Sequence, residues 1–129
     1  VLVISLDLKR ADRPSGFGVT SHGGKKLTDL DAMEWIRRVE DAGAGELLVN
    51  SIDADGTKNG FDIELIGQIK DQTALPVIAS GGAGSLEHFV EAARAGADAI
   101  LAASVFHEGQ ISIAEVKKAL NEASVEVRL

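Results

Sequence analysis

The chain contains no cysteine and no tyrosine, only two prolines, and aromatic side chains make up 4% of its 129 residues. Without cysteine it can form neither disulfides nor thiolate metal sites, which suits the reducing conditions of the cytoplasm. So few aromatic side chains leave no platform on which nucleic-acid bases could stack.

Basic residues are also in the minority, with 13 Lys and Arg against 20 Asp and Glu and a formal net charge of −7. Nucleic acid is therefore not expected as a partner, because its phosphates require basic faces. No apolar run is long enough to span a bilayer and no basic segment precedes an apolar stretch. Neither a membrane helix nor a signal peptide is therefore expected.

The three histidines, His22, His88 and His107, do not have the spacing of metal ligands. His88 falls in a predicted helix with polar neighbours, and we expect it at the surface. We expect no metal ion and no other cofactor.

Apolar strand patterns and helical patterns alternate four times along the chain. The expected strands cover residues 1–6, 46–52, 77–80 and 99–103, and a strand-like tail covers 125–129. The expected helices begin at Asp29 or Asp31, at Asp62, at Ser85 and close to Ile113. The segment Leu8–Thr28, rich in Gly, Ser and Lys, is expected to be a long loop. Alternating strands and helices predict an α/β fold with parallel strand pairing.

Four such units are half of a (β/α)8 TIM barrel, which needs about 250 residues. We therefore predict a single (β/α)4 half-barrel domain over residues 1–129. A half barrel has two open sheet edges and an uncovered inner face, so it should pair with a second half or with a copy of itself. The start at Val1, inside a strand pattern, indicates a fragment, an excised domain or a design. A flavodoxin-like sheet is the alternative, although it usually has a fifth strand and helices on both faces.

The segment Ser80–Gly84 follows an apolar strand and precedes a helix, so its backbone N–H groups and the helix dipole should converge on one place. Such a place suits a phosphate. A second donor group is expected after the strand at 99–103, where Ser104 opens the next turn. In TIM barrels the loops after the last two strands commonly form a phosphate site.

Asp7 ends the first expected strand, at the barrel end where chemistry occurs, and could serve as a general base or acid. Equally, it could cap a loop or pair with Lys9 or Arg10. In the loop at 53–60, Gly56 could offer an N–H and Thr57 a hydroxyl to phosphate oxygens. Asp55 would order this loop. The acids there resemble the start of a calcium loop, but the later ligands of that pattern are missing.

Three strings carry a family resemblance, namely LLVNSIDADGTKNGFD at 47–62, IASGGAGSLEHF at 78–89 and AASVFH at 102–107. The chain closely resembles the cyclase subunit of imidazole glycerol phosphate synthase, an enzyme of histidine biosynthesis. The resemblance covers the whole chain and corresponds to the C-terminal half of that barrel. It implies cyclase (lyase) chemistry on a ribonucleotide with a phosphate at each end, using ammonia from a glutaminase partner.

The resemblance also implies roles for individual residues. Asp7 would be a general base whose partner acid lies in the other half barrel. Asn50 and Ser80 would line the pocket, and Glu46 would belong to a charged ring where ammonia enters, although from position alone Glu46 is a solvated strand end. The implied phosphate grip consists of Asp55, Gly56, Gly82, Ala103 and Ser104, to which the residue patterns add Thr57 and Gly81.

Three other functions stay open. The chain could be an isolated or engineered half barrel that self-associates and binds phosphate without turnover. It could be the sister isomerase of the same pathway, although that enzyme usually has Gly, a basic residue and Ala-Leu-Tyr where this chain has Ala102–Phe106. A generic phosphate-binding barrel is the remaining alternative.

Overall fold

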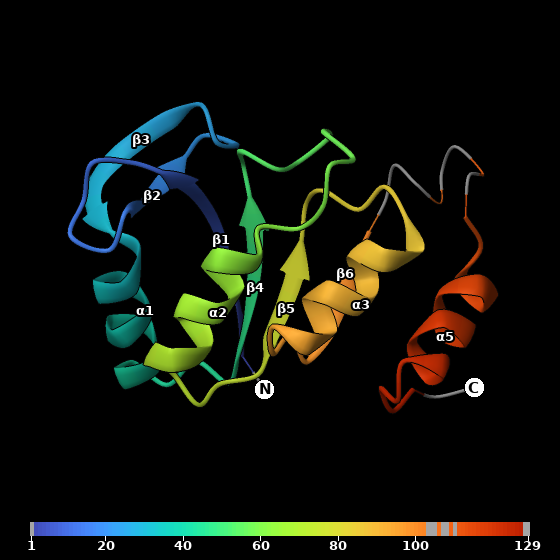
Figure 1. Cartoon of the computed structure of the whole chain (residues 1–129). Helices are drawn as coiled ribbons and strands as arrows, with labels where there is room; N and C mark the ends of the chain where they lie inside the picture. The colour runs from blue at the N-terminus through green and yellow to red at the C-terminus, as the bar shows by residue number, and fades with distance from the viewer. Residues whose placement is uncertain (1, 103–105, 107–108, 110, 128–129) are drawn as a thin grey trace.

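The computed structural model describes residues 2–102, 106, 109 and 111–127, and it shows one sheet with helices packed against it (Figure 1). The sheet has six strands in the order β3-β2-β1-β4-β5-β6. These strands are β1 (Val3–Arg10), β2 (Phe17–Ser21), β3 (Lys26–Asp31), β4 (Glu46–Ser51), β5 (Val77–Ser80) and β6 (Ala99–Leu101). The helices are α1 (Ala32–Asp41), α2 (Ile63–Gln72), α3 (Leu86–Arg94) and α5 (Ile113–Glu122).

The strands β1, β4, β5 and β6 pair in parallel and in sequence order, as the alternation of strands and helices predicts. The helices α1, α2 and α3 lie on one face of the sheet, and α5 packs beside α3 (Figure 1). Helices on a single face confirm the half-barrel prediction and disfavour the flavodoxin-like alternative, which would cover both faces.

The prediction of a long loop over Leu8–Thr28 is wrong, because this segment forms most of a β-hairpin. The strand β1 continues to Arg10, and β2 and β3 then pair antiparallel beside it, so the sheet is mixed rather than wholly parallel. Gly23 and Gly24 have positive φ at the tip of the hairpin. The hairpin covers the edge of β1, which the sequence analysis expects to be open.

Several element boundaries also differ from the expected ones. The first strand begins at Val3 and continues to Arg10, so Asp7 lies inside β1 rather than at its end. The strand β6 ends at Leu101, and the rest of the expected strand includes residues outside the described part of the chain. Residues 125–127 form no strand; Val125 and Val127 instead pack against a helix-side core cluster. The helix α1 begins after Asp31, not Asp29.

Two apolar clusters hold the helices on the sheet. The first joins β1, β2 and β4 to α1 and α2, and its fully buried members include Leu8, Ile36 and Leu47. The second joins β5 to α3 and α5, and in it the rings of Phe61 and Phe89 meet edge to face at 5.7 Å. Burial of these side chains is the main term that stabilises such a layered fold.

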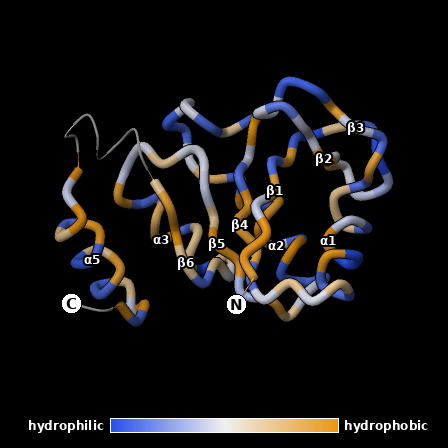
Figure 2. Tube along the Cα trace, turned by 180° about the vertical axis from the view of Figure 1, so that it is seen from behind, coloured by the Kyte–Doolittle hydropathy of each residue, from blue (hydrophilic) through white to orange (hydrophobic). Residues whose placement is uncertain are grey.

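The opposite face of the parallel strands is not covered by any helix of the described residues (Figure 2). Because side chains alternate along a strand, this face carries residues such as Leu48, Ile78 and the half-exposed Leu101. In a complete barrel this face would be the packed interior. None of the described helices is long and apolar enough to cross a membrane.

Candidate active site

The register of the parallel strands puts polar side chains in one row at their carboxyl ends. Asp7 of β1 is opposite Asn50 of β4, Asn50 is opposite Ser80 of β5, and Ser80 is opposite Leu101 of β6. Asp7, Asn50 and Ser80 alternate with buried neighbours, so their side chains belong to the uncovered face, and the half-exposed Leu101 continues this row. The Nδ2 atom of Asn50 donates to Oδ1 of Asp7 at 3.4 Å. The structure thus brings together Asp7, the expected base, with Asn50 and Ser80, which are expected to line the pocket.

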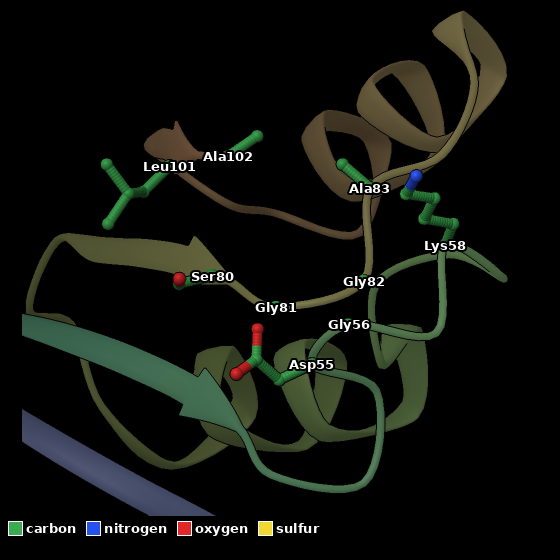
Figure 3. A pocket seen from close by; sticks show the side chains of 9 residues that line it. All are labelled: Asp55, Gly56, Lys58, Ser80, Gly81, Gly82, Ala83, Leu101 and Ala102. Atoms are coloured by element: carbon green, nitrogen blue, oxygen red, sulfur yellow. The ribbon is translucent and has the colours of Figure 1, made fainter. Parts of the chain in front are cut away.

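A cavity of about 70 Å³ lies at the same end, between the loop after β4 and the loop after β5. Predicted and unpredicted residues line it together (Figure 3), namely Asp55, Gly56, Lys58, Ser80, Gly81, Gly82, Ala83, Leu101 and Ala102. The predicted residues Ala103 and Ser104 lie outside the described residues.

The two loops around the cavity interlock through their glycines. The Gly60 N–H donates to the carbonyl oxygen of Gly82 at 2.8 Å. Gly82 has φ +116°, and a Cβ at this position would overlap the Gly60 carbonyl. A Cβ on Gly84 would likewise overlap the carbonyl of Lys58. Only glycine therefore allows the loops to approach this closely.

Three residues that line the cavity have a backbone N–H for which the described residues provide no acceptor. Within the described part of the chain, the N–H groups of Gly82 and Ala83 have no hydrogen-bond acceptor, although both residues are buried. The N–H of Gly56, in the exposed loop after β4, has none there either. A buried N–H without an acceptor costs free energy, so such donors suit an anion that would satisfy them. The N-terminus of α3 adds partial positive charge beside them.

The sequence predicts that the backbone N–H groups of the glycine loop converge on an anion. Not all of them are available for this role. The N–H groups of Gly84 and Ser85 both donate to Nδ1 of His88, at 2.9 and 3.1 Å. His88 is half-buried against this loop, so its expected place as a solvent-facing surface residue is wrong. Its sequence signal was its position three residues after Ser85, where a side chain can reach back to cap a helix.

The sequence predicts that Thr57 offers its hydroxyl to a phosphate, but Thr57 does not line the cavity. Its hydroxyl donates to the Ala54 carbonyl at 2.7 Å, and its N–H donates to the same oxygen at 3.1 Å. Both groups therefore close a turn of the loop after β4. The reason is local: a threonine hydroxyl readily bonds to the backbone of its own turn.

Two side chains of opposite charge line the cavity. The carboxylate of Asp55 points toward Gly81, and Lys58 lies on the same loop (Figure 3). Lys58 is not among the site residues expected from the sequence, although a basic residue two positions after Gly56, in a loop near an expected phosphate site, is a usable signal. The pair gives the cavity one hydrogen-bond acceptor and one cation in addition to its backbone donors.

Arg10, at the end of β1, connects the hairpin to the loop after β4. It is not among the site residues that the sequence predicts. Its N–H donates to Asp53 Oδ2 at 2.6 Å, and its guanidinium donates to Asp62 at 2.8 Å and to Glu64 at 3.3 Å. The guanidinium also lies 5.0 Å from the ring centroid of Phe17. The alternative in which Asp7 pairs with Arg10 is therefore wrong, since Arg10 binds the acids at the start of α2.

Glu46 begins β4 opposite Val3, at the other end of the strands from Asp7, as expected. This position fits the bottom of a barrel. Among the described residues, no three His, Cys, Asp or Glu side chains form a group that could hold a metal ion.

The parallel strands alternate with helices that lie on one face of the sheet, and glycine-rich loops line a cavity at the carboxyl ends of the strands. This arrangement defines half of a (β/α)8 barrel. The chain belongs to the histidine biosynthesis protein family, whose sequence profile matches residues 1–112. This membership confirms the resemblance found from sequence.

Curated relatives agree with this assignment. The chain is 63% identical over 129 residues to imidazole glycerol phosphate synthase subunit HisF of Leifsonia xyli, covering 99% of this chain and 51% of that protein. It is 57% identical over 128 residues to the HisF subunit of Clavibacter michiganensis, covering 99% of this chain and 49% of the relative. The HisF subunit of Thermobifida fusca is 53% identical over 132 residues, with 99% and 52% covered. The chain thus spans about half the length of these relatives.

Proposed function

We propose that this chain supplies the C-terminal half barrel of an imidazole glycerol phosphate synthase cyclase. The reaction would be the ammonia-dependent cyclisation and cleavage of a ribonucleotide with a phosphate at each end. The observation that carries this proposal is the row Asp7–Asn50–Ser80 lying at the same end as a cavity with unsatisfied backbone donors.

One phosphate of the substrate would occupy the cavity between the two interlocked loops. The N–H groups of Gly56, Gly82 and Ala83 would donate to its oxygens, and Ala103 and Ser104 would complete the grip. The Asp55 carboxylate accepts hydrogen bonds but donates none when ionised, so it suits a sugar hydroxyl beside the phosphate. This combination favours a sugar phosphate.

Asp7 would act as the general base, because its side chain lies on the uncovered face of β1, opposite Asn50 and near the end of the parallel pairing of β1 with β4. The Asn50 amide, donating to Asp7 Oδ1, would orient the carboxylate. A substrate anchored by phosphates at both ends holds its reactive centre between the two rims, where a second acid from the other half would act with Asp7. Ammonia from a glutaminase partner would enter at the opposite end, near Glu46. We place this chemistry in the cytoplasm.

The uncovered face requires a partner for this function. Residues such as Val3 and Leu101 are 46% and 50% exposed there, and in the described part of the chain β6 is an open edge. The partner in the proposed enzyme is an N-terminal half barrel. The same face favours a second candidate function, in which two copies of this chain pair and bind phosphate without turnover.

Reconstitution tests the proposal. The chain would be mixed with the N-terminal half of the HisF subunit of Leifsonia xyli, and turnover of the bisphosphorylated substrate with ammonium salt would be followed. We expect turnover from the mixture and only background from either half alone. Background turnover from a folded mixed complex would overturn the enzymatic proposal. Phosphate binding by a dimer of this chain alone would then support the second candidate.

A further inference from the structure

The imidazole of His88 lies where the two loops of the cavity cross. Its Nδ1 atom accepts hydrogen bonds from the N–H groups of Gly84 and Ser85. The ring also lies against Gly60, since a Cβ built there would be 3.3 Å from Cδ2 of His88. Gly60 in turn donates to Gly82. One side chain therefore contacts both loops at the point where they are joined.

Both hydrogen bonds require that Nδ1 carries no proton, because a backbone N–H can donate only to a lone pair. The imidazole is therefore neutral, with its proton on Nε2. The side chain stabilises the glycine loop as an uncharged acceptor.

The N-terminus of helix α5 is capped in the same way, but by a charged side chain. Its N-cap Ser112 accepts from the Glu115 N–H at 3.1 Å, and Oε1 of Glu115 accepts from the Ser112 N–H at 3.1 Å. Glu115 occupies the position in α5 that His88 occupies in α3. Glutamate and glutamine are the usual residues there because both complete a capping box, and the charge of glutamate also interacts favourably with the helix dipole.

We propose that His88 is a positioning residue of the phosphate site, holding the glycine loop with a neutral acceptor where a carboxylate would repel the anion. This inference rests on the proposed function, in which the cavity binds a phosphate. The cavity already contains the carboxylate of Asp55. A second negative charge beside the loop would oppose a phosphate dianion, whereas the neutral imidazole makes the same hydrogen bonds without that repulsion.

Three substitutions in the full chain separate the hydrogen-bonding role from the charge. His88→Gln keeps a neutral acceptor, His88→Glu keeps an acceptor but adds a negative charge, and His88→Ala removes the acceptor. Each variant would be measured at pH 7.5 for its thermal unfolding midpoint and for its affinity for inorganic phosphate by calorimetry. The amide resonances of Gly84 and Ser85 would report the loop conformation.

We expect His88→Gln to keep the unfolding midpoint and a phosphate affinity within about twofold of the unmodified chain, since it retains a neutral acceptor. His88→Glu should keep the midpoint but bind phosphate about three- to tenfold more weakly. His88→Ala should lower both quantities and shift both amide resonances. Glu115→Gln is the matched control, because it alters the same helix position in α5 and should leave phosphate affinity unchanged.

The outcomes separate this inference from the proposed function. Phosphate binding by the unmodified chain that His88→Glu leaves unchanged would overturn the role of His88 alone. If His88→Glu does not fold, equal phosphate affinities and amide resonances in the Gln and Ala variants would overturn it as well. No phosphate binding by the unmodified chain would overturn the proposed function and this inference together. A ¹⁵N spectrum showing a proton on Nδ1 would contradict the hydrogen bonds themselves.

Discussion

The Nδ2 atom of Asn50 lies 3.4 Å from Oδ1 of Asp7, across the parallel pair of β4 and β1. At this distance the hydrogen bond is weak, so it orients the carboxylate more than it stabilises the fold. The two residues are far apart in sequence, and only the register of the two strands brings them together.

Asp7→Asn should abolish most turnover of the reconstituted barrel while leaving phosphate binding intact. The change removes the proposed base but preserves the shape of the side chain, and one acid–base group contributes about 10²–10⁴-fold in rate. Steady-state kinetics and phosphate calorimetry on the same preparation would test both parts. Unchanged turnover would exclude Asp7 as the base.

Gly82→Ala should destabilise the chain by more than 2 kcal/mol, on the order of other strained backbone substitutions, and abolish phosphate binding. The added Cβ would overlap the Gly60 carbonyl and meet an unfavourable φ of +116°. Urea unfolding and phosphate calorimetry would measure the two effects.

Gly67→Ala is the matched control for that substitution. Gly67 lies inside α2, and a Cβ there would meet no atom within 4 Å. The variant should therefore be more stable than the unmodified chain by about 0.5–1 kcal/mol, because alanine favours a helix. Equal effects of the two substitutions would contradict the interlocked loops.

Acidification should destabilise the chain partly through Asp31, the N-cap of α1. Burial by itself raises the pKa of Asp31, but hydrogen bonds from Ser15, Glu34 and Met33 outweigh it and lower the pKa below its ordinary value of 3.8. The ionised carboxylate therefore stabilises the folded chain above that value, and this contribution is lost as pH falls through the lower, folded pKa.

Asp31→Asn tests this pH dependence. Asparagine is a good N-cap but uncharged, so the variant should lose about 1 kcal/mol at pH 7 and show a smaller loss of stability below pH ~4. Denaturant titrations across this range would measure it. Some acid sensitivity should remain from Asp98. Burial by itself raises the pKa of Asp98, but the hydrogen bonds from Lys70 and Val77 and the charge of Lys70 outweigh burial and lower the pKa below its ordinary value. A variant curve parallel to that of the unmodified chain would contradict the assignment.

Arg10→Ala should loosen the loop after β4 and cost about 1 kcal/mol. Its partner Asp62 has a side chain only 7% exposed, and the guanidinium also packs on Phe17. Arg38→Ala is the control, since its ion pair with Glu34 is fully on the surface, with side chains 59% and 58% exposed, and should contribute less than about 0.5 kcal/mol. Amide hydrogen exchange in the loop at 53–60 should accelerate in the first variant only. Similar exchange in both would argue against the connection.

Local sequence signals predicted most of the fold and part of the site. Apolar runs located β4 and β5, and helical spacing with Asp62 and Ser85 located the starts of α2 and α3. Glycines between a strand and a helix also located the loop that lines the cavity. These features depend on neighbours within a few residues, so they can be read along the chain.

The rest depended on contacts between distant residues. The hairpin of β2 and β3 looked like a loop because its polar composition hides the pairing with β1 that stabilises it. His88 looked like a surface residue because its acceptor role exists only when the glycine loop folds back over the helix. The sequence suggests Thr57 as a phosphate ligand, but its hydroxyl is used by the hydrogen bond to the Ala54 carbonyl, which closes a local turn.

The sequence by itself determined the alternation of the parallel strands with the helices and the positions of the glycines, because apolar periodicity and φ preferences act locally. The tertiary structure alone decided that Asp7, Asn50 and Ser80 share one row and which backbone donors stay unsatisfied. Strand register and loop crossing set those distances, and both arise only when segments far apart in the chain pack together.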